Sequence, residues 1–153
     1  MDNQLKRIFA RLRETCDFSE TDFSDVNASS SDGDNGLHGV VRWGDLSAAK
    51  ALIDAGIDVN KAGDLGFTPL HVACMRGDAD MVKLLIDQGA DIFALSEGDA
   101  PFATARFGGH DHICASLAPL MKQAQSLDPK IWARARIAQL RREIANLEEK
   151  LGP

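Results

Sequence analysis

The sequence repeats itself at a fixed interval. The stretch Gly66–Ile92 resembles the stretch Gly36–Val59, and ten of the 24 positions in Leu37–Asn60 are identical to the residue 33 positions later. The identical pairs are Leu37/Leu70, His38/His71, Gly44/Gly77, Asp45/Asp78, Lys50/Lys83, Leu52/Leu85, Ile53/Ile86, Asp54/Asp87, Gly56/Gly89 and Asp58/Asp91. A fixed period of this length is typical of a stacked repeat protein.

The second unit has the pattern of two short helices. Apolar residues recur at helical spacing in residues 70–73 and again in residues 81–85. Gly77 lies between these segments, where a tight turn needs left-handed backbone, and Gly89 follows the second helix as a helix-ending glycine does. Helices this short cannot bury their apolar faces alone, so neighbouring units must stack. The sequence therefore predicts an all-α solenoid.

These residues resemble the ankyrin repeat. The second unit matches the family pattern, from the G-x-T-P-L-H-x-A start to the closing G-A-D, at Gly66, Thr68, Pro69, Leu70, His71, Ala73, Gly77, Val82, Leu84, Leu85, Gly89, Ala90 and Asp91. The first unit lacks the Thr-Pro start, and the third has Phe102 and Ala103 where Leu-His is usual. The resemblance implies an ankyrin-repeat domain of about three units over residues 36–120, with atypical units at its ends.

The resemblance also implies a function. Ankyrin repeats present an extended concave surface to a partner protein and carry no chemistry of their own. Within that class we expect an immunity-type inhibitor of a toxin, by analogy with small solitary ankyrin proteins of bacteria. An adaptor or scaffold in a signalling or secretion complex is the alternative. His38 and His71 match a family position whose histidine has a structural role, bonding backbone and the threonine side chain across the hairpin.

The partner-binding residues implied by the family pattern lie at the hairpin tips and on the outward edge of each first helix. They are Arg42, Trp43, Asp64, Leu65, Phe67, Met75, Arg76, Glu97, Asp99 and Phe107. The apolar members should form an exposed stripe of the kind that marks an interface. The alternative is that the N-terminal helix or the segment with Phe18 and Phe23 folds back over part of this stripe.

Two helices are expected beside the repeats. Residues 1–16 have the apolar spacing of an amphipathic helix, and residues 17–35 form an acidic, Ser- and Asp-rich linker. Residues 121–153 contain a long helix, starting with Asp128 as N-cap and Pro129 at the first position, that we expect to cap the stack. Its apolar residues alternate by three and four, so a homodimeric coiled coil is the alternative to a capped monomer.

Charge and composition limit the classes of partner. The net charge is −6, and residues 17–36 carry six acids and no base. This distribution argues against nucleic acid and favours a protein partner with a basic surface. No run of about 18–20 apolar residues suggests a membrane span. The charged N-terminus lacks the apolar core of a secretory signal, and the three cysteines form neither a disulfide framework nor a CxxC pair, so a cytoplasmic location is expected.

A catalytic function has one set of candidate residues. His110, His112 and Cys114 stand close together in the sequence and could serve a metal-dependent enzyme. A zinc site would need further ligands, and none stands at metal-ligand spacing. We therefore expect no enzyme activity, no metal and no cofactor.

Overall fold

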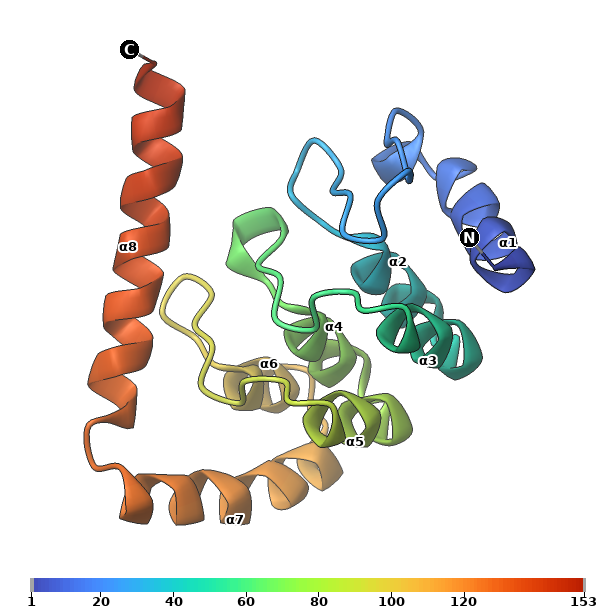
Figure 1. The fold of residues 1–153 in the computed structure, drawn as a ribbon. Helices are drawn as coiled ribbons and strands as arrows, with labels where there is room; N and C mark the ends of the chain where they lie inside the picture. The colour runs from blue at the N-terminus through green and yellow to red at the C-terminus, as the bar shows by residue number, and fades with distance from the viewer. Residues whose placement is uncertain (1, 153) are drawn as a thin grey trace.

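The computed structural model describes residues 2–152, and within them every regular element is a helix (Figure 1). The elements are α1 (Asn3–Arg13), η1 (Cys16–Phe18), α2 (Gly36–Trp43), α3 (Leu46–Asp54), η2 (Asp64–Gly66), α4 (Pro69–Arg76), α5 (Ala79–Asp87), α6 (Pro101–Phe107), α7 (Asp111–Leu127) and α8 (Ile131–Leu151). The predicted all-α solenoid with flanking helices is confirmed. None of these helices, within the described part of the chain, is long and apolar enough to cross a bilayer.

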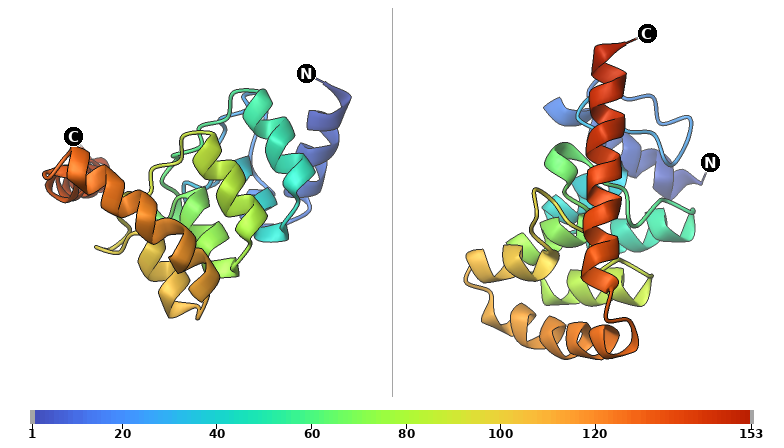
Figure 2. Two further views of the ribbon diagram at one scale, coloured as in Figure 1. Left: turned by 90° about the horizontal axis from the view of Figure 1, so that it is seen from below. Right: turned by 90° about the vertical axis from the view of Figure 1, so that its left-hand side faces the viewer.

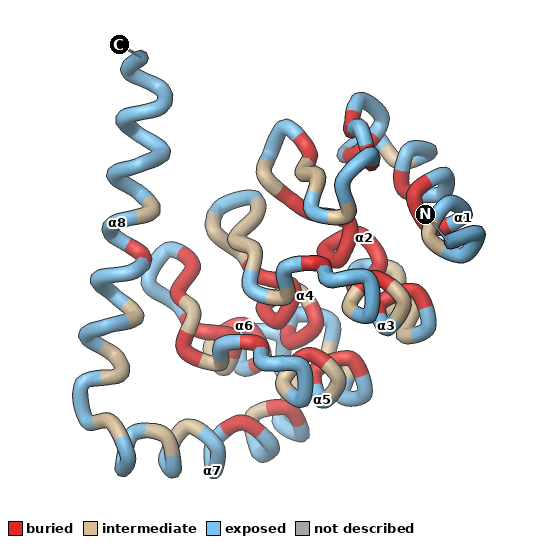
Figure 3. The backbone as a smooth tube through the Cα atoms, in the orientation of Figure 1, coloured by how far each residue is buried: buried red, intermediate tan, exposed pale blue. Residues whose placement is uncertain are grey.

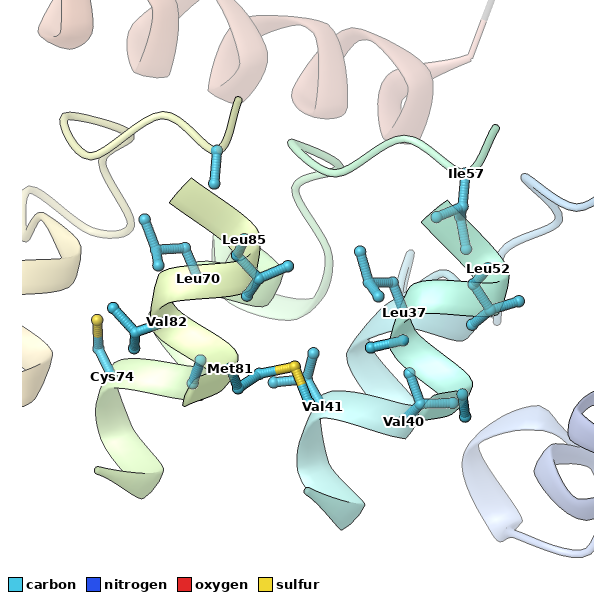
Figure 4. Packing of buried hydrophobic residues seen from close by; sticks show 14 of the residues in the cluster. Leu37, Val40, Val41, Leu52, Ile57, Leu70, Cys74, Met81, Val82 and Leu85 are labelled. Atoms are coloured by element: carbon cyan, nitrogen blue, oxygen red, sulfur yellow. The ribbon is translucent and has the colours of Figure 1, made fainter. Parts of the chain in front are cut away.

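The repeats stack as two layers of helices. The inner layer is α2, α4 and α6, and the outer layer is α3, α5 and α7, with each helix packed against its counterpart in the next unit (Figure 2). The core between them is apolar, and Leu37, Leu52, Leu70 and Leu85 are fully buried. Met81 points towards Val41 of the preceding unit, which joins the two cores (Figure 4).

The N-terminal helix extends the outer layer. α1 packs on α3 and α2 and buries Ile8, Phe9 and Leu12. Gly39 of α2 lies directly under the Leu12 side chain, where a Cβ atom would collide with it. α1 therefore takes the place of the outer helix of a preceding half unit.

The segment 17–35 differs from the predicted linker, because it is packed on the stack as a hairpin. Phe18 and Phe23 are buried, and the Phe23 ring stacks on Phe9 with 4.4 Å between centroids. Asn27 donates to the Gly56 carbonyl at 3.3 Å and accepts from the Asp58 amide at 2.7 Å.

The same asparagine bridge recurs one period later. Asn60 donates to the Gly89 carbonyl at 3.0 Å and accepts from the Asp91 amide at 2.7 Å. Asn27 and Asn60 stand one repeat period apart, so the period begins upstream of residue 36.

Two buried histidines connect each inner helix to the next hairpin. The backbone N–H of Asn35 donates to Nδ1 of His38 at 3.1 Å, and His38 Nε2 donates to the Phe67 carbonyl at 3.0 Å. In the next unit the Thr68 amide bonds Nδ1 of His71 at 3.1 Å, and Nε2 bonds the Asp99 carbonyl at 3.1 Å. Because Nδ1 accepts and Nε2 donates, both rings are neutral.

Burial keeps these rings neutral. Desolvation lowers the pKa of His38 below 6.5, and it lowers the pKa of His71 to about 4. The Arg142 guanidinium lowers the pKa of His71 further, and the hydrogen bond to the Asp99 carbonyl opposes the shift. The structural role implied for these histidines agrees with this geometry.

The C-terminal helix differs from the predicted cap. α7 continues to Leu127, so Asp128 ends α7, and its carboxylate accepts the Lys130 amide at 3.1 Å. α8 then runs along the hairpins instead of across the end of the stack (Figure 1). Arg142 donates to the Leu95 carbonyl at 2.6 Å, and the rings of Trp132 and Phe93 form a T-shaped pair with 4.8 Å between centroids. The length of α7 explains the difference, because it carries the chain past the last unit before α8 begins.

We predict that Gly77→Ala destabilises the protein more than Gly89→Ala. Both glycines have positive φ (+71° and +88°), so both substitutions cost about 1–2 kcal/mol in backbone strain. Only at Gly77 would the added Cβ also collide with a side chain, the His110 ring. Urea unfolding measures both; equal losses of unfolding free energy would contradict the packing of His110 on this turn.

We predict that stability falls as the pH is lowered from about 6.5 towards 4. In this window the unfolded chain binds protons at His38 and His71 more readily than the folded chain does, because both pKa values are lowered by folding, so acid favours unfolding. For His71, whose pKa is lowered to about 4, the loss is on the order of 3 kcal/mol. Urea unfolding at pH 7, 6, 5 and 4 measures this loss, most of which develops below pH 6.

A His71→Gln variant is the control for the acid effect. It should be less stable than the parent at pH 7 and should lose less stability on acidification. Equal losses in the two proteins would show that this ring does not drive the acid effect.

Candidate functional site

A groove opens between the inner helices and the hairpins of the second and third units. It is lined by Phe67, Met75, Ser96, Glu97, Asp99, Thr104, Phe107 and Gly108. Five of these residues, Phe67, Met75, Glu97, Asp99 and Phe107, belong to the predicted binding set. The hairpin residues that bond α8 are different ones, so α8 leaves this groove open.

The apolar part of the groove comes from equivalent positions of successive units. Met75 and Phe107 each stand in the last turn of an inner helix, just before the turn to the outer helix. The turn ends the helix there, and both side chains extend into solvent: Met75 is 50% exposed and Phe107 is 77% exposed. Phe67, at the start of the second unit, lies edge-on against His71, with 5.5 Å between centroids. None of the three belongs to the buried core.

The hairpin tips form the rim of the groove and are strained. Leu65 and Gly66 have φ of 52° and 82°, and Glu97 and Gly98 have φ of 50° and 98°. Two adjacent residues in the left-handed region make the tight turn typical of β-hairpins, which favours Asn-Gly. Here a leucine takes the position that favours asparagine, and Leu65 is 61% exposed at the tip. Ser96 Oγ donates to the Leu65 carbonyl at 2.8 Å and so connects the two hairpins.

The same tips concentrate negative charge. Asp64, Glu97 and Asp99 are exposed in the second and third hairpins, and Asp32 is exposed in the first. Carboxylates therefore follow the rim beside the apolar floor. This electrostatic pattern complements a basic surface.

At the N-terminal end the structure differs from the predicted stripe. Trp43 is only partly exposed, and the Arg11 guanidinium of α1 lies 4.0 Å from its ring centroid. This is the alternative in which the N-terminal helix covers part of the stripe. The physical reason is that α1 extends the outer layer and brings Arg11 over the end of α2.

The two predicted arginines lie outside the groove. Arg42 pairs with Asp17 at 3.2 Å and with the buried carboxylate of Asp34. Arg76 is exposed and reaches back over the turn at Gly44. Arg42 therefore ties the first hairpin to α2.

Three lining residues were not predicted. Ser96, Thr104 and Gly108 are small or polar, and the sequence criterion favoured large or charged residues at variable positions. For Thr104 the sequence did contain a signal. It places a hydroxyl in α6 at the position that the apolar Val72 occupies in α4, three residues after the proline that begins each helix. Its hydroxyl donates to the Pro101 carbonyl at 2.7 Å.

The residues of the catalytic alternative are engaged with backbone. His110 Nε2 lies 2.8 Å from the Met75 carbonyl, and His112 Nε2 lies 3.1 Å from the Gly77 carbonyl. Cys114 Sγ faces the Phe102 carbonyl at 3.9 Å. Among residues 2–152, no group of three His, Cys, Asp or Glu side chains is placed to hold a metal ion. Burial, with a contribution from Cys114, raises the pKa of the Cys74 thiol to about 12, which leaves it unreactive at neutral pH.

Comparison with known proteins identifies the architecture. Comparison with curated protein sequences gives no match. The family model of ankyrin repeats, in three copies, matches residues 5–96, which include most of α1 and the first hairpin. The match thus starts well before residue 36, where the repeats were predicted to begin, and ends before α6. It spans more than half of the chain, and the chain belongs to the ankyrin-repeat family.

Proposed function

We propose that the chain is a non-catalytic binding protein that holds a partner protein in the groove between its inner helices and hairpins. Ankyrin repeats are protein-interaction modules in general. The observation that carries the proposal here is the exposure of Leu65, Met75 and Phe107 on hairpin tips and inner helices. These side chains contribute nothing to the core, so their exposure in the free protein is a cost that binding would recover.

The partner has a basic surface that meets the acidic rim. Asp64, Glu97 and Asp99 would face its cationic groups while the apolar floor receives a protruding side chain. Charges on a rim act mainly on the rate of association and on specificity, and the desolvated floor supplies most of the affinity. Covering the cationic surface of the partner is sufficient to keep that surface from its own targets. A binding protein of this kind can therefore inhibit its partner without a chemical reaction. We therefore propose an immunity-type inhibitor of a toxin.

A specific observation favours a second candidate, an adaptor or scaffold. An adaptor needs two separate surfaces, and α8 carries exposed apolar residues on a part of the molecule that does not line the groove. They are Ile137, Leu140, Ile144, Leu147 and Leu151.

We predict that replacing Met75 and Phe107 by alanine weakens partner binding and leaves folding unchanged. Each truncation should lower the affinity at least about tenfold if the residue fills a pocket on the partner. Affinity capture from extracts of the native host, with the parent and each variant as bait, identifies the partner; calorimetry then gives the dissociation constants. Leu127→Ala is the matched control, because Leu127 is 81% exposed on α7, outside the groove.

The proposal fails if the double variant Met75→Ala/Phe107→Ala binds the same partner as tightly as the parent does. Urea unfolding of each variant must coincide with that of the parent, which separates loss of binding from loss of the fold. If Leu127→Ala weakened binding as much, the interface would lie elsewhere.

We predict that Leu65→Asn stabilises the protein and weakens binding. Asparagine adopts positive φ more readily than leucine, so the substitution should relieve part of the roughly 1–2 kcal/mol of strain at φ 52°. The melting temperature should rise by about 2–4 °C per kcal/mol recovered. Partner affinity should fall, because an exposed apolar contact is lost. A lower melting temperature would contradict the strain, and unchanged affinity would place Leu65 outside the interface.

A further inference from the structure

The helix α8 turns its apolar side away from the stack. Trp132 and Arg142 contact the hairpins, and Gln139, on the same side of the helix, is only 2% exposed. The large apolar residues on the other side of the helix are exposed by 40% to 83%: Ile137, Leu140, Ile144, Leu147 and Leu151. A helix on a protein surface normally buries its apolar stripe, so this arrangement is the reverse of the usual one.

The C-terminal part of α8 also projects beyond the rest of the molecule. Every residue from 143 to 151 is exposed, and Figure 3 shows α8 exposed along most of its length. A helical end without tertiary contacts is only marginally stable in water. Both the stripe and the projecting end would be stabilised by a partner helix.

The spacing of the stripe is that of a two-stranded coiled coil. The residues follow one another by three and four, with Ile137, Ile144 and Leu151 at one heptad position and Leu140 and Leu147 at the other. Branched residues at the first position and leucine at the second suit two strands. The residues that flank the stripe then decide which way the second strand runs.

Flanking charges disfavour a parallel pair of identical helices. In a parallel pair, Arg136 would face Arg141 of the second copy, and Glu143 would face Glu148 of the second copy. Both contacts join like charges, and each would occur twice by symmetry. Like charges at these positions set orientation by repulsion.

The antiparallel arrangement turns both contacts into attractions. When Ile144 packs on Leu147 of the second copy, and Leu140 on Leu151, Arg141 faces Glu148 and Glu143 faces Lys150. The overlap is residues 140–151, which include the projecting segment 143–151. The stacks do not lie between the two helices, because Arg142, which bonds the Leu95 carbonyl, is on the opposite side of α8. Glu143 also accepts a hydrogen bond from Gln139 at 2.7 Å, which holds its side chain beside the stripe.

We propose that the chain forms an antiparallel homodimer through residues 140–151 of α8. The dimer presents two grooves, so a partner with two binding sites would be held more tightly by avidity. This inference rests on α8 alone and is independent of what the groove binds. In the dimer the second copy covers the apolar side of α8, so that side does not serve as the second surface of an adaptor.

Sedimentation equilibrium of the full chain tests the proposal. The overlap is short, so we expect reversible association in the range of roughly 1–100 µM, with a limiting mass twice the 16.5 kDa of one chain. Ile144→Asp should abolish the dimer and leave the urea transition of the stack unchanged. Asn146→Asp is the matched control, because it adds the same charge about 200° further round the helix and should dimerise as the parent does.

Glu143→Lys decides the orientation. In the antiparallel dimer the introduced lysine would face Lys150 of the second copy, and association should weaken roughly fivefold over two symmetric contacts. In a parallel dimer the introduced lysine would face Glu148 instead, and association should strengthen. Glu143→Gln, which removes the attraction without adding repulsion, should fall between the parent and Glu143→Lys.

Three results would overturn the proposal. A mass of one chain throughout this concentration range excludes self-association. A dimer that survives Ile144→Asp lies on another surface. A dimer tightened by Glu143→Lys is parallel.

Discussion

Two buried imidazole rings hold the hairpins of this protein at a fixed distance from the inner helices. His38 reaches from α2 to the Phe67 carbonyl, and His71 reaches from α4 to the Asp99 carbonyl. Each ring also receives the backbone N–H at the start of its own helix, so one neutral side chain joins the helix start to the following hairpin. Asn27 and Asn60 make a parallel series of bonds on the outer-helix side. These bridges fix the hairpins relative to the inner helices, and the groove lies between the two.

The groove follows from this fixed geometry. The inner helices end at the interhelical turns, and Met75 and Phe107 remain exposed in their last turns. The hairpins place acidic residues next to Met75 and Phe107. Their tight turns hold Leu65 and Glu97 in the left-handed backbone conformation. Strain of this kind persists only where the surrounding structure holds it, and it often marks functional surfaces. α8 contacts other hairpin residues, such as Phe93 and Leu95, and so stiffens the hairpins without filling the groove.

The sequence predicted the fold where the repeat is well preserved. It did not predict the hairpin in residues 17–35, because the acidic composition there suggested a linker and drew attention away from the repeat period. Asp25, Val26 and Asn27 stand one repeat period before Asp58, Val59 and Asn60, but they lie in a segment with six acids and no base. Composition suggested a linker there, whereas hydrogen bonds through Asn27 fix a hairpin. The partial burial of Trp43 could not be predicted either. Arg11, which lies over its ring, belongs to a helix that precedes the repeat units identified in the sequence.

The placement of α8 lay beyond sequence reasoning for a different reason. An apolar stripe normally predicts the buried side of a helix, yet here the opposite side, with Gln139 and Arg142, meets the stack. Which side packs depends on carbonyls such as that of Leu95, and the sequence does not show where these lie. The alternating spacing did indicate a coiled coil, and the exposure of the stripe is consistent with that alternative.

The most direct test of the histidine bridges is the protonation state of the two rings at neutral pH. Long-range proton–nitrogen correlation spectra of the histidine side chains distinguish the two neutral tautomers from each other and from the charged ring. The structure requires a proton on Nε2 and a bare Nδ1 in both His38 and His71, because Nε2 faces a carbonyl oxygen and Nδ1 receives a backbone N–H. Spectra at pH 7 should show this single tautomer for both rings. A proton on Nδ1, or rapid exchange between tautomers, would contradict the bridges and the stacking built on them.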